Sequence, residues 1–168
     1  FRHACENGHL ETAKWLYSLG GVNIHILEEW AFRYSCQYGY LEIAKWLYSF
    51  GGVDIHAKHD YAFCFSCQEG HLEVSKWLYS LGVDIHANHD YAFIQSCRLG
   101  YVETVKWLYN LGDIDIHAVD EDIFGNGDLE TMRFLYSLDP TVYINNPEYL
   151  RDFTIEDLES GSLTKPCR

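Results

Sequence analysis

The chain has 168 residues, of which 48% are apolar and 16% aromatic, and its formal net charge is −13. This apolar content is enough for one domain with a substantial core. An acidic chain without a basic stripe is a poor candidate for binding nucleic acid or an anionic membrane, and no apolar run approaches the roughly 20 residues of a membrane span, so we expect neither partner.

The most informative feature of the chain is that it repeats itself. The tetrad KWLY occurs four times, and RFLY at 133–136 is a fifth, weaker copy. The tryptophans of the four copies are spaced by 31, 31 and 30 residues: Trp15, Trp46, Trp77 and Trp107. A period near 30 is typical of solenoids in which stacked helix pairs share one continuous core. Aromatic residues that recur at fixed repeat positions are therefore interpreted as core.

Each unit is predicted to hold two helices. In the third unit the first helix spans 61–69 and ends at Gly70, and the second spans 72–80 and ends at Gly82. A glycine just past a helix can take the left-handed conformation that caps it. Spacings of three and four along the second helix predict an inward face made of Leu72, Ser75, Trp77, Leu78 and Leu81.

Charged residues also recur along the second helix. Glu73 lies in its first turn, where a carboxylate complements the positive end of the helix dipole. Lys76 follows three residues later and is predicted to pair with Glu73. The other units carry the same pair at Glu11 and Lys14, Glu42 and Lys45, and Glu103 and Lys106.

The segments between units are rich in histidine and aspartate. DIHAKHDYAF occupies 54–63 and DIHANHDYAF occupies 84–93. Asp60 and Asp90 stand directly before a predicted first helix, and we expect them to act as N-caps.

The C-terminal part of the chain departs from the pattern. Residues 120–147 read as a degenerate unit, and Pro140 and Pro147 interrupt it. Two short acidic helical segments are predicted at 146–153 and 154–161. Residues 113–160 carry 13 acidic and 2 basic side chains. Terminal units of a solenoid need a polar outer face, so we interpret 120–160 as a cap.

The repeated segment, here GHLEVSKWLYSLGVDIHA at 70–87, resembles the second helix and following hairpin of the ankyrin repeat. The resemblance covers residues 1–119 well and continues weakly to about 145. The first helix departs from the family, because WAFR, YAFC and YAFI at 30–33, 61–64 and 91–94 replace the usual Thr-Pro-Leu-His. The Trp-, Tyr- and His-rich style is similar to ankyrin arrays of giant DNA viruses of amoebae.

The resemblance implies an all-α ankyrin-type helical repeat solenoid with short β-hairpin or turn connections. Residues 1–119 are expected to form about four repeats, and 120–168 a degenerate fifth repeat with an acidic cap and tail. Phe1 aligns with Phe32, Phe63 and Phe93, so the first repeat is truncated. We expect apolar surface at that end, and either a longer parent protein or something else that covers it.

Four cysteines share one repeat position, where ankyrin repeats usually have a small alanine: Cys5, Cys36, Cys67 and Cys97. Copies in successive units are expected about one helix spacing apart, roughly 8–10 Å, whereas a disulfide needs Cα atoms within about 7 Å. We predict free thiols packed as small hydrophobes, which suit a reducing, cytoplasmic compartment (the host cytoplasm if the protein is viral).

Histidines form a second column, made of His25, His56, His86 and His117. The matching ankyrin residue is often an asparagine of the hairpin, so the resemblance implies that this column fastens the hairpin. His59 and His89 occur only in the two middle hairpins. A His-x-x-His pair lacks the i, i+4 spacing and third ligand of a helical zinc site. We therefore assign no metal, no cofactor and no catalytic residue, and metal binding by hairpin His and Asp stays an alternative.

Variation between units separates scaffold from candidate contacts. First-helix columns just before the central glycine, and the hairpin tips, change freely in size and charge, which packing does not tolerate. We predict that these positions are exposed, and ankyrin resemblance places them on the concave groove that holds partners. The candidate partner-binding residues are Arg33, Tyr34, Tyr38, Lys58, His59, Glu69, Asn88, His89, Gln95, Arg98 and Leu99.

These observations favour a monomeric, non-enzymatic module that binds a partner protein through the concave face. A repeating sequence offers no unique pocket for catalysis. The competing hypothesis is a spacer or targeting segment of a longer protein whose activity lies elsewhere.

Overall fold

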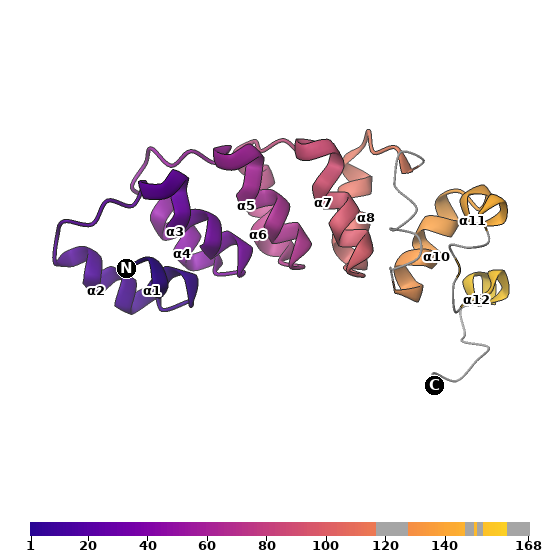
Figure 1. The fold of residues 1–168 in the computed structure, drawn as a ribbon, viewed down its shortest axis with the longest axis horizontal. Coiled ribbons are helices and arrows are strands. Elements are labelled where there is room, and N and C mark those ends of the chain that lie inside the picture. Colours follow the sequence, from indigo (N-terminus) through magenta and orange to yellow (C-terminus); the bar gives the residue numbers. More distant parts are fainter. Residues whose placement is uncertain (117–127, 147–149, 151–152, 161–168) are drawn as a thin grey trace. The chain divides into compact units, whose positions relative to one another are not determined.

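The computed structural model describes residues 1–116, 128–146, 150 and 153–160, and within these ranges the chain forms helices joined by turns, with no strand (Figure 1). The expected connections between repeats are therefore turns wherever they are described. The first helices of the four units are α1 (Arg2–Glu6), α3 (Ile26–Gln37), α5 (Ala57–Gln68) and α7 (Ala87–Arg98). Their second helices are α2 (Leu10–Ser18), α4 (Leu41–Tyr48), α6 (Leu72–Leu81) and α8 (Val102–Leu111). Three helices follow: α10 (Leu129–Leu138), α11 (Thr141–Asn145) and α12 (Ile155–Ser160).

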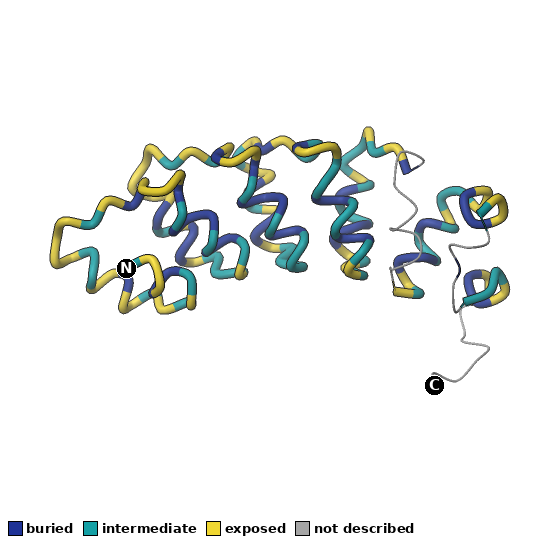
Figure 2. Tube along the Cα trace, viewed as in Figure 1, coloured by how far each residue is buried: buried dark blue, intermediate teal, exposed yellow. Residues whose placement is uncertain are grey.

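The chain divides into two compact units, Phe1–Ala92 and Phe93–Arg168. In the first unit α3 packs between α1 and α5, and each of these first helices packs on its own second helix. The shared core is apolar and follows the helices from repeat to repeat, as the dark segments of Figure 2 show. Its largest fully buried side chains in this unit are Phe32, Phe63, Ile43, Leu47 and Leu78.

Of the predicted inward face of the second helix, Ser75 and Leu78 are buried, whereas Leu72, Trp77 and Leu81 are half-buried. In α6 Val74 is buried as well. Trp77 packs instead against the preceding repeat, because its ring meets Tyr48 edge to face with centroids 5.8 Å apart. Tyr17 and Trp46 make the same contact at 5.8 Å.

The glycine that ends each first helix is required for two reasons. Gly39 has a φ of +79°, which favours a residue without a Cβ. A Cβ at Gly39 would also lie 2.6–2.8 Å from three ring atoms of His71, which comes from the next repeat. Gly8 and Tyr40 have the same relation, with a closest approach of 2.5 Å. The predicted capping glycine thus also leaves space for a ring from the following repeat to pack against the backbone.

Two large apolar side chains near the N-terminal end of the first unit, one on α2 and one directly after it, are exposed to solvent. Trp15 is 60% exposed and Leu19 is 64% exposed, whereas the later tryptophans of this unit are half-buried.

In the second compact unit α10 packs against α8, α11 and α12. Pro140, expected to break the pattern, ends one helix and begins another, because its φ of −61° suits the start of α11. The predicted helical segment at 154–161 is found as α12, whereas most of 146–153 lies outside the described residues. The α12 helix starts with a reciprocal cap in which Thr154 N donates to Asp157 Oδ2 and Asp157 N donates to Thr154 Oγ1.

The second unit is also held together by polar contacts to α12. Arg133 donates from Nε and Nη2 to the carbonyl oxygen of Asp157, at 3.0 and 2.8 Å. Tyr136 Oη donates to Glu159 Oε1 at 2.9 Å. The acidic segment thus packs on the last repeat helix of its own unit.

Candidate interaction surface

The helices α3, α5 and α7 each contain one left-handed turn near their N-terminal end. Lys58, His59 and Asp60 have φ values of 59°, 57° and 56°. The same three-residue turn occurs at Leu27–Glu29 and Asn88–Asp90. A left-handed residue with a Cβ costs roughly 1–2 kcal/mol, so three in succession need compensating contacts.

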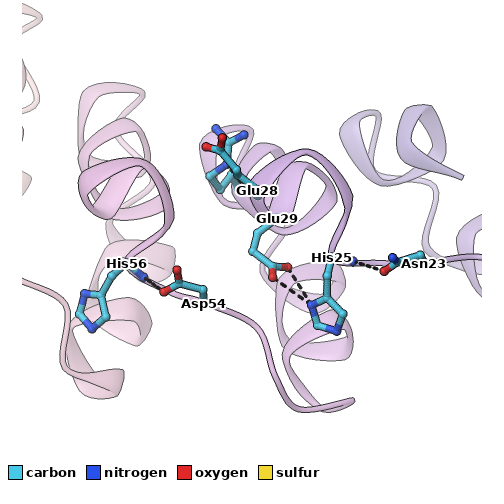
Figure 3. A network of polar contacts seen from close by, with 7 residues as sticks. Asn23, His25, Glu28, Glu29, Asp54 and His56 are labelled. Carbon is cyan, nitrogen blue, oxygen red and sulfur yellow. Dashed lines mark hydrogen bonds and ion pairs between the residues drawn. The ribbon is translucent and has the colours of Figure 1, made fainter.

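A histidine–carboxylate clamp closes each of these turns. His56 Nδ1 lies 2.8 Å from Asp60 Oδ1, and His86 Nδ1 lies 2.6 Å from Asp90 Oδ1. In the turn at Leu27–Glu29 a glutamate replaces the aspartate, and Glu29 Oε1 lies 2.9 Å from His25 Nδ1 (Figure 3). An ionised carboxylate can only accept, so Nδ1 carries the proton.

The histidine backbone is fixed as well, because Asp54 Oδ1 accepts from His56 N at 3.0 Å, and Asn23 does the same for His25 (Figure 3). The structural interpretation of the histidine column is thus confirmed for His25, His56 and His86, and His117 lies outside the described residues.

The expectation that Asp60 and Asp90 act as N-caps is wrong. An N-cap residue has an extended backbone and its side chain accepts from a helical N–H. Asp60 instead has a φ of 56°, is buried, and turns its carboxylate back to the histidine four residues earlier.

Arg33 is not the exposed contact residue that its variability suggested. It is 6% exposed. Its guanidinium donates to the carbonyl oxygens of Glu28 at 2.6 Å and Leu27 at 3.1 Å. It also lies over the ring of Tyr61, 4.6 Å from the centroid. Arg33 therefore stabilises the left-handed turn of its own repeat, and a direct contact with a partner stays a prediction.

The remaining candidates lie at or near the surface. Those with exposed side chains are Tyr38, Lys58, His59, Asn88, His89 and Leu99, and those that are half-buried are Tyr34, Glu69, Gln95 and Arg98. In the first unit the turn tips contact one another. Lys58 Nζ lies 2.8 Å from Glu28 Oε2, and Asn88 Nδ2 donates to the carbonyl oxygen of His59 at 3.3 Å.

Aromatic rings join the first helices of the first unit side by side. Tyr34 stacks on Trp30 with centroids 4.2 Å apart and lies 5.9 Å from Tyr61. Tyr61 stacks on Phe65 at 4.0 Å, and Phe65 lies 5.7 Å from the ring of Tyr91. Tyr61 Oη also donates to Gln37 Oε1 at 2.7 Å. Among the rings of this aromatic track, variation between units indicated only Tyr34, because positions 30, 61 and 91 are all aromatic.

The described cysteines are free and buried: Cys5, Cys36, Cys64, Cys67 and Cys97. Burial raises the pKa of Cys5 to about 11 and the pKa values of Cys64 and Cys67 to about 12. A thiol with a raised pKa is a poor nucleophile and metal ligand. Cys64 and Cys67 have the spacing Cys-x-x-Cys that is found in some metal sites, but their burial on α5 indicates a packing role.

The structure offers little for metal or small-molecule chemistry. Among the described residues no group of three His, Cys, Asp or Glu side chains is placed to hold a metal ion. A hollow of about 280 Å³ lies between two turns, lined by Glu28, Glu29, Asp54, Ala57 and Lys58. Its carboxylates are already engaged by Lys58, by His25 and by the backbone N–H of His56. Nor is any helix in the described part of the chain long and apolar enough to cross a membrane.

Comparisons with known proteins agree with this architecture. A family model described as ankyrin repeats (3 copies) matches residues 32–120, and one described as ankyrin repeats (many copies) matches residues 1–47. No curated protein matches the sequence. The crystal structure of the human ASB11 ankyrin repeat domain is similar in fold, with a TM-score of 0.66 at 18% identity, over 82% of this chain and 68% of that one. Ankyrin repeats are generally protein–protein interaction modules. The chain thus belongs to the ankyrin-repeat family, and its fold is an all-α ankyrin solenoid.

Proposed function

We propose that this protein is a non-enzymatic module that binds a partner protein through the first-helix and turn side of its repeats, which corresponds to the concave face of ankyrin-type arrays. One observation carries the proposal. Tyr38 and Leu99 occupy the same repeat position, differ in side chain, and remain 41% and 51% exposed. Exposed apolar side chains at a position that packing leaves free are typical of contact anchors.

The character of the other first-helix positions supports the proposal. Arg98 stands one residue before Leu99, and its buried Nε has no hydrogen-bond partner among the described residues. Arginine and tyrosine are enriched among residues that dominate binding energy in interfaces. The free, buried thiols are consistent with a reducing, cytoplasmic setting for such binding.

The test is affinity capture from lysate with mass spectrometry, using the chain and its Tyr38→Ala, Arg98→Ala, Leu99→Ala triple variant. We expect at least one protein to be captured by the chain and lost from the variant. The matched control is Tyr79→Ala, which removes a tyrosine of similar exposure, 42%, from a second helix. Capture unchanged by the triple variant, or lost equally in the control, contradicts the proposal.

A further inference from the structure

Two carboxylates on the first-helix side of the first unit, those of Glu6 and Glu69, have no lysine or arginine partner among the described residues. Glu6 contacts His3, and Glu69 accepts from the side-chain amide of Gln68. The lysines of residues 1–92 are used elsewhere, in pairs with Glu11, Glu42, Glu73 and Glu28.

These two carboxylates flank an exposed aromatic ring. Glu6 is the last residue of α1, Tyr38 directly follows α3, and Glu69 directly follows α5, while α3 packs between α1 and α5. The pKa of Tyr38 is raised by partial loss of hydration and then by the negative charges of Glu6 and Glu69. The order of these helices thus places one carboxylate on each side of Tyr38.

The ring itself belongs to an aromatic surface that accepts guanidinium groups. The centroid of Tyr38 lies 6.1 Å from that of Tyr34, which continues to Tyr61. Within the chain, Arg33 already lies over Tyr61, and Arg2 lies 5.6 Å from the ring centroid of Trp30. Tyr38 differs from these rings because it is 41% exposed and no arginine of the described chain lies over it.

We propose that the Tyr38 patch, made of Glu6, Tyr34, Tyr38 and Glu69, binds an arginine or lysine side chain on a basic segment of the partner. Charge complementarity selects this occupant. A cation over the exposed face of a tyrosine is attracted by its π-system, and adjacent carboxylates add charge-assisted hydrogen bonds. Arginine is preferred to lysine, because its planar guanidinium stacks on a ring and bonds two carboxylate oxygens together. This inference rests on the proposed function and names the chemistry of the partner.

The experiment is selection of a displayed library of random 12-residue peptides on the full chain. Arginine and lysine are expected to be enriched at least about threefold over the unselected library, and the best clone is then made as a labelled peptide. Its affinity is measured for the chain, for Glu6→Gln with Glu69→Gln, and for Tyr38→Ala. Each change is expected to weaken binding about tenfold, and added salt weakens binding to the chain itself.

Matched controls separate the patch from general electrostatics and from folding. The pair Glu42→Gln with Glu73→Gln makes the same charge change on the second helices, and Tyr79→Ala removes a similarly exposed ring there. Both are expected to leave the affinity within about twofold, and thermal melts check that every variant is folded.

Two further outcomes overturn the inference and leave the proposed function standing, and a third counts against both. Apolar or acidic clones that depend on Leu99 or Arg98 would retain first-helix binding and reject the basic occupant. Basic clones that bind the patch variants and the controls equally would show only attraction to an acidic chain. The absence of any binding clone would count against both proposals.

Discussion

The two helices of each repeat use their surface residues differently. On the second helices the same Glu–Lys pair recurs at 2.9, 3.6, 3.1 and 3.0 Å, and a tyrosine of one repeat meets the tryptophan of the next edge to face. On the first helices and their turns the polar contacts differ between repeats. One contact comes from the guanidinium of Arg33, another is the Lys58–Glu28 pair, and a third comes from the side-chain amide of Asn88. The constant side makes the same contacts in successive repeats, whereas the contacts of the variable side differ from repeat to repeat.

The largest loss of stability is expected at Gly39, in the turn between the first and second helix of its repeat. Gly39→Ala forces a Cβ into the ring of His71 at a φ of +79°, which should cost about 2–4 kcal/mol of unfolding free energy in urea denaturation. Gly51→Ala is the matched control, because its φ is +77° but no atom lies within 4 Å of the added Cβ. It should cost only about 1 kcal/mol. Equal losses for the two variants would show that the approach of His71 is unimportant.

The second effect tests whether the constant side joins repeats. Trp77→Ala removes contacts with Tyr48 and Phe32, at 5.8 and 6.1 Å between centroids, and should cost about 2–3 kcal/mol. Trp15→Ala makes the same chemical change at a tryptophan that is 60% exposed, and should cost less than about 1 kcal/mol. Thermal and urea unfolding measure both, and the prediction fails if Trp15 matters as much as Trp77.

A smaller loss of stability is expected for changes in the left-handed turn at 58–60. Asp60→Ala removes the acceptor for His56 and leaves a left-handed alanine, with an expected loss of about 1–2 kcal/mol. Asp60→Asn should lose less, because asparagine tolerates this backbone region and keeps an oxygen acceptor. If alanine proves as stable as aspartate, the clamp does not stabilise the turn.

The smallest effect concerns the recurring ion pairs. Glu73→Gln breaks the 3.1 Å contact with Lys76, whose side chain is 44% exposed and that of Glu73 76% exposed. Such a pair should contribute about 0.5 kcal/mol or less, and nothing at high salt. A larger, salt-resistant loss would mean that the constant side depends on charge as well as on its rings.

The sequence predicted the regular parts of the fold because each depends on local periodicity. The helices around 61–69 and 72–80, the glycines after the first helices, and the Glu73–Lys76 pair all follow from spacing within one repeat. The assignment of residues 1–119 and 120–168 to separate domains stays a prediction.

Features that depend on particular side-chain contacts rather than on periodicity were not predicted. The left-handed turn at 58–60 contains no glycine that would predict it from the sequence. The contact between His56 and Asp60 explains it. Variability indicated exposure for Arg33, but variability alone cannot tell a solvent-facing side chain from one that folds back onto its own turn. The aromatic track was missed for the opposite reason, since its positions vary little between units.

The clamp between repeats has a consequence for how such arrays change length. All of its hydrogen bonds lie within one short stretch, from Asp54 to Asp60 in the joint described above. A tandem duplication or deletion of one period therefore carries a complete joint with it and leaves no half-made contact behind. The array can therefore lengthen or shorten by whole repeats without changing the contacts that hold each of these turns.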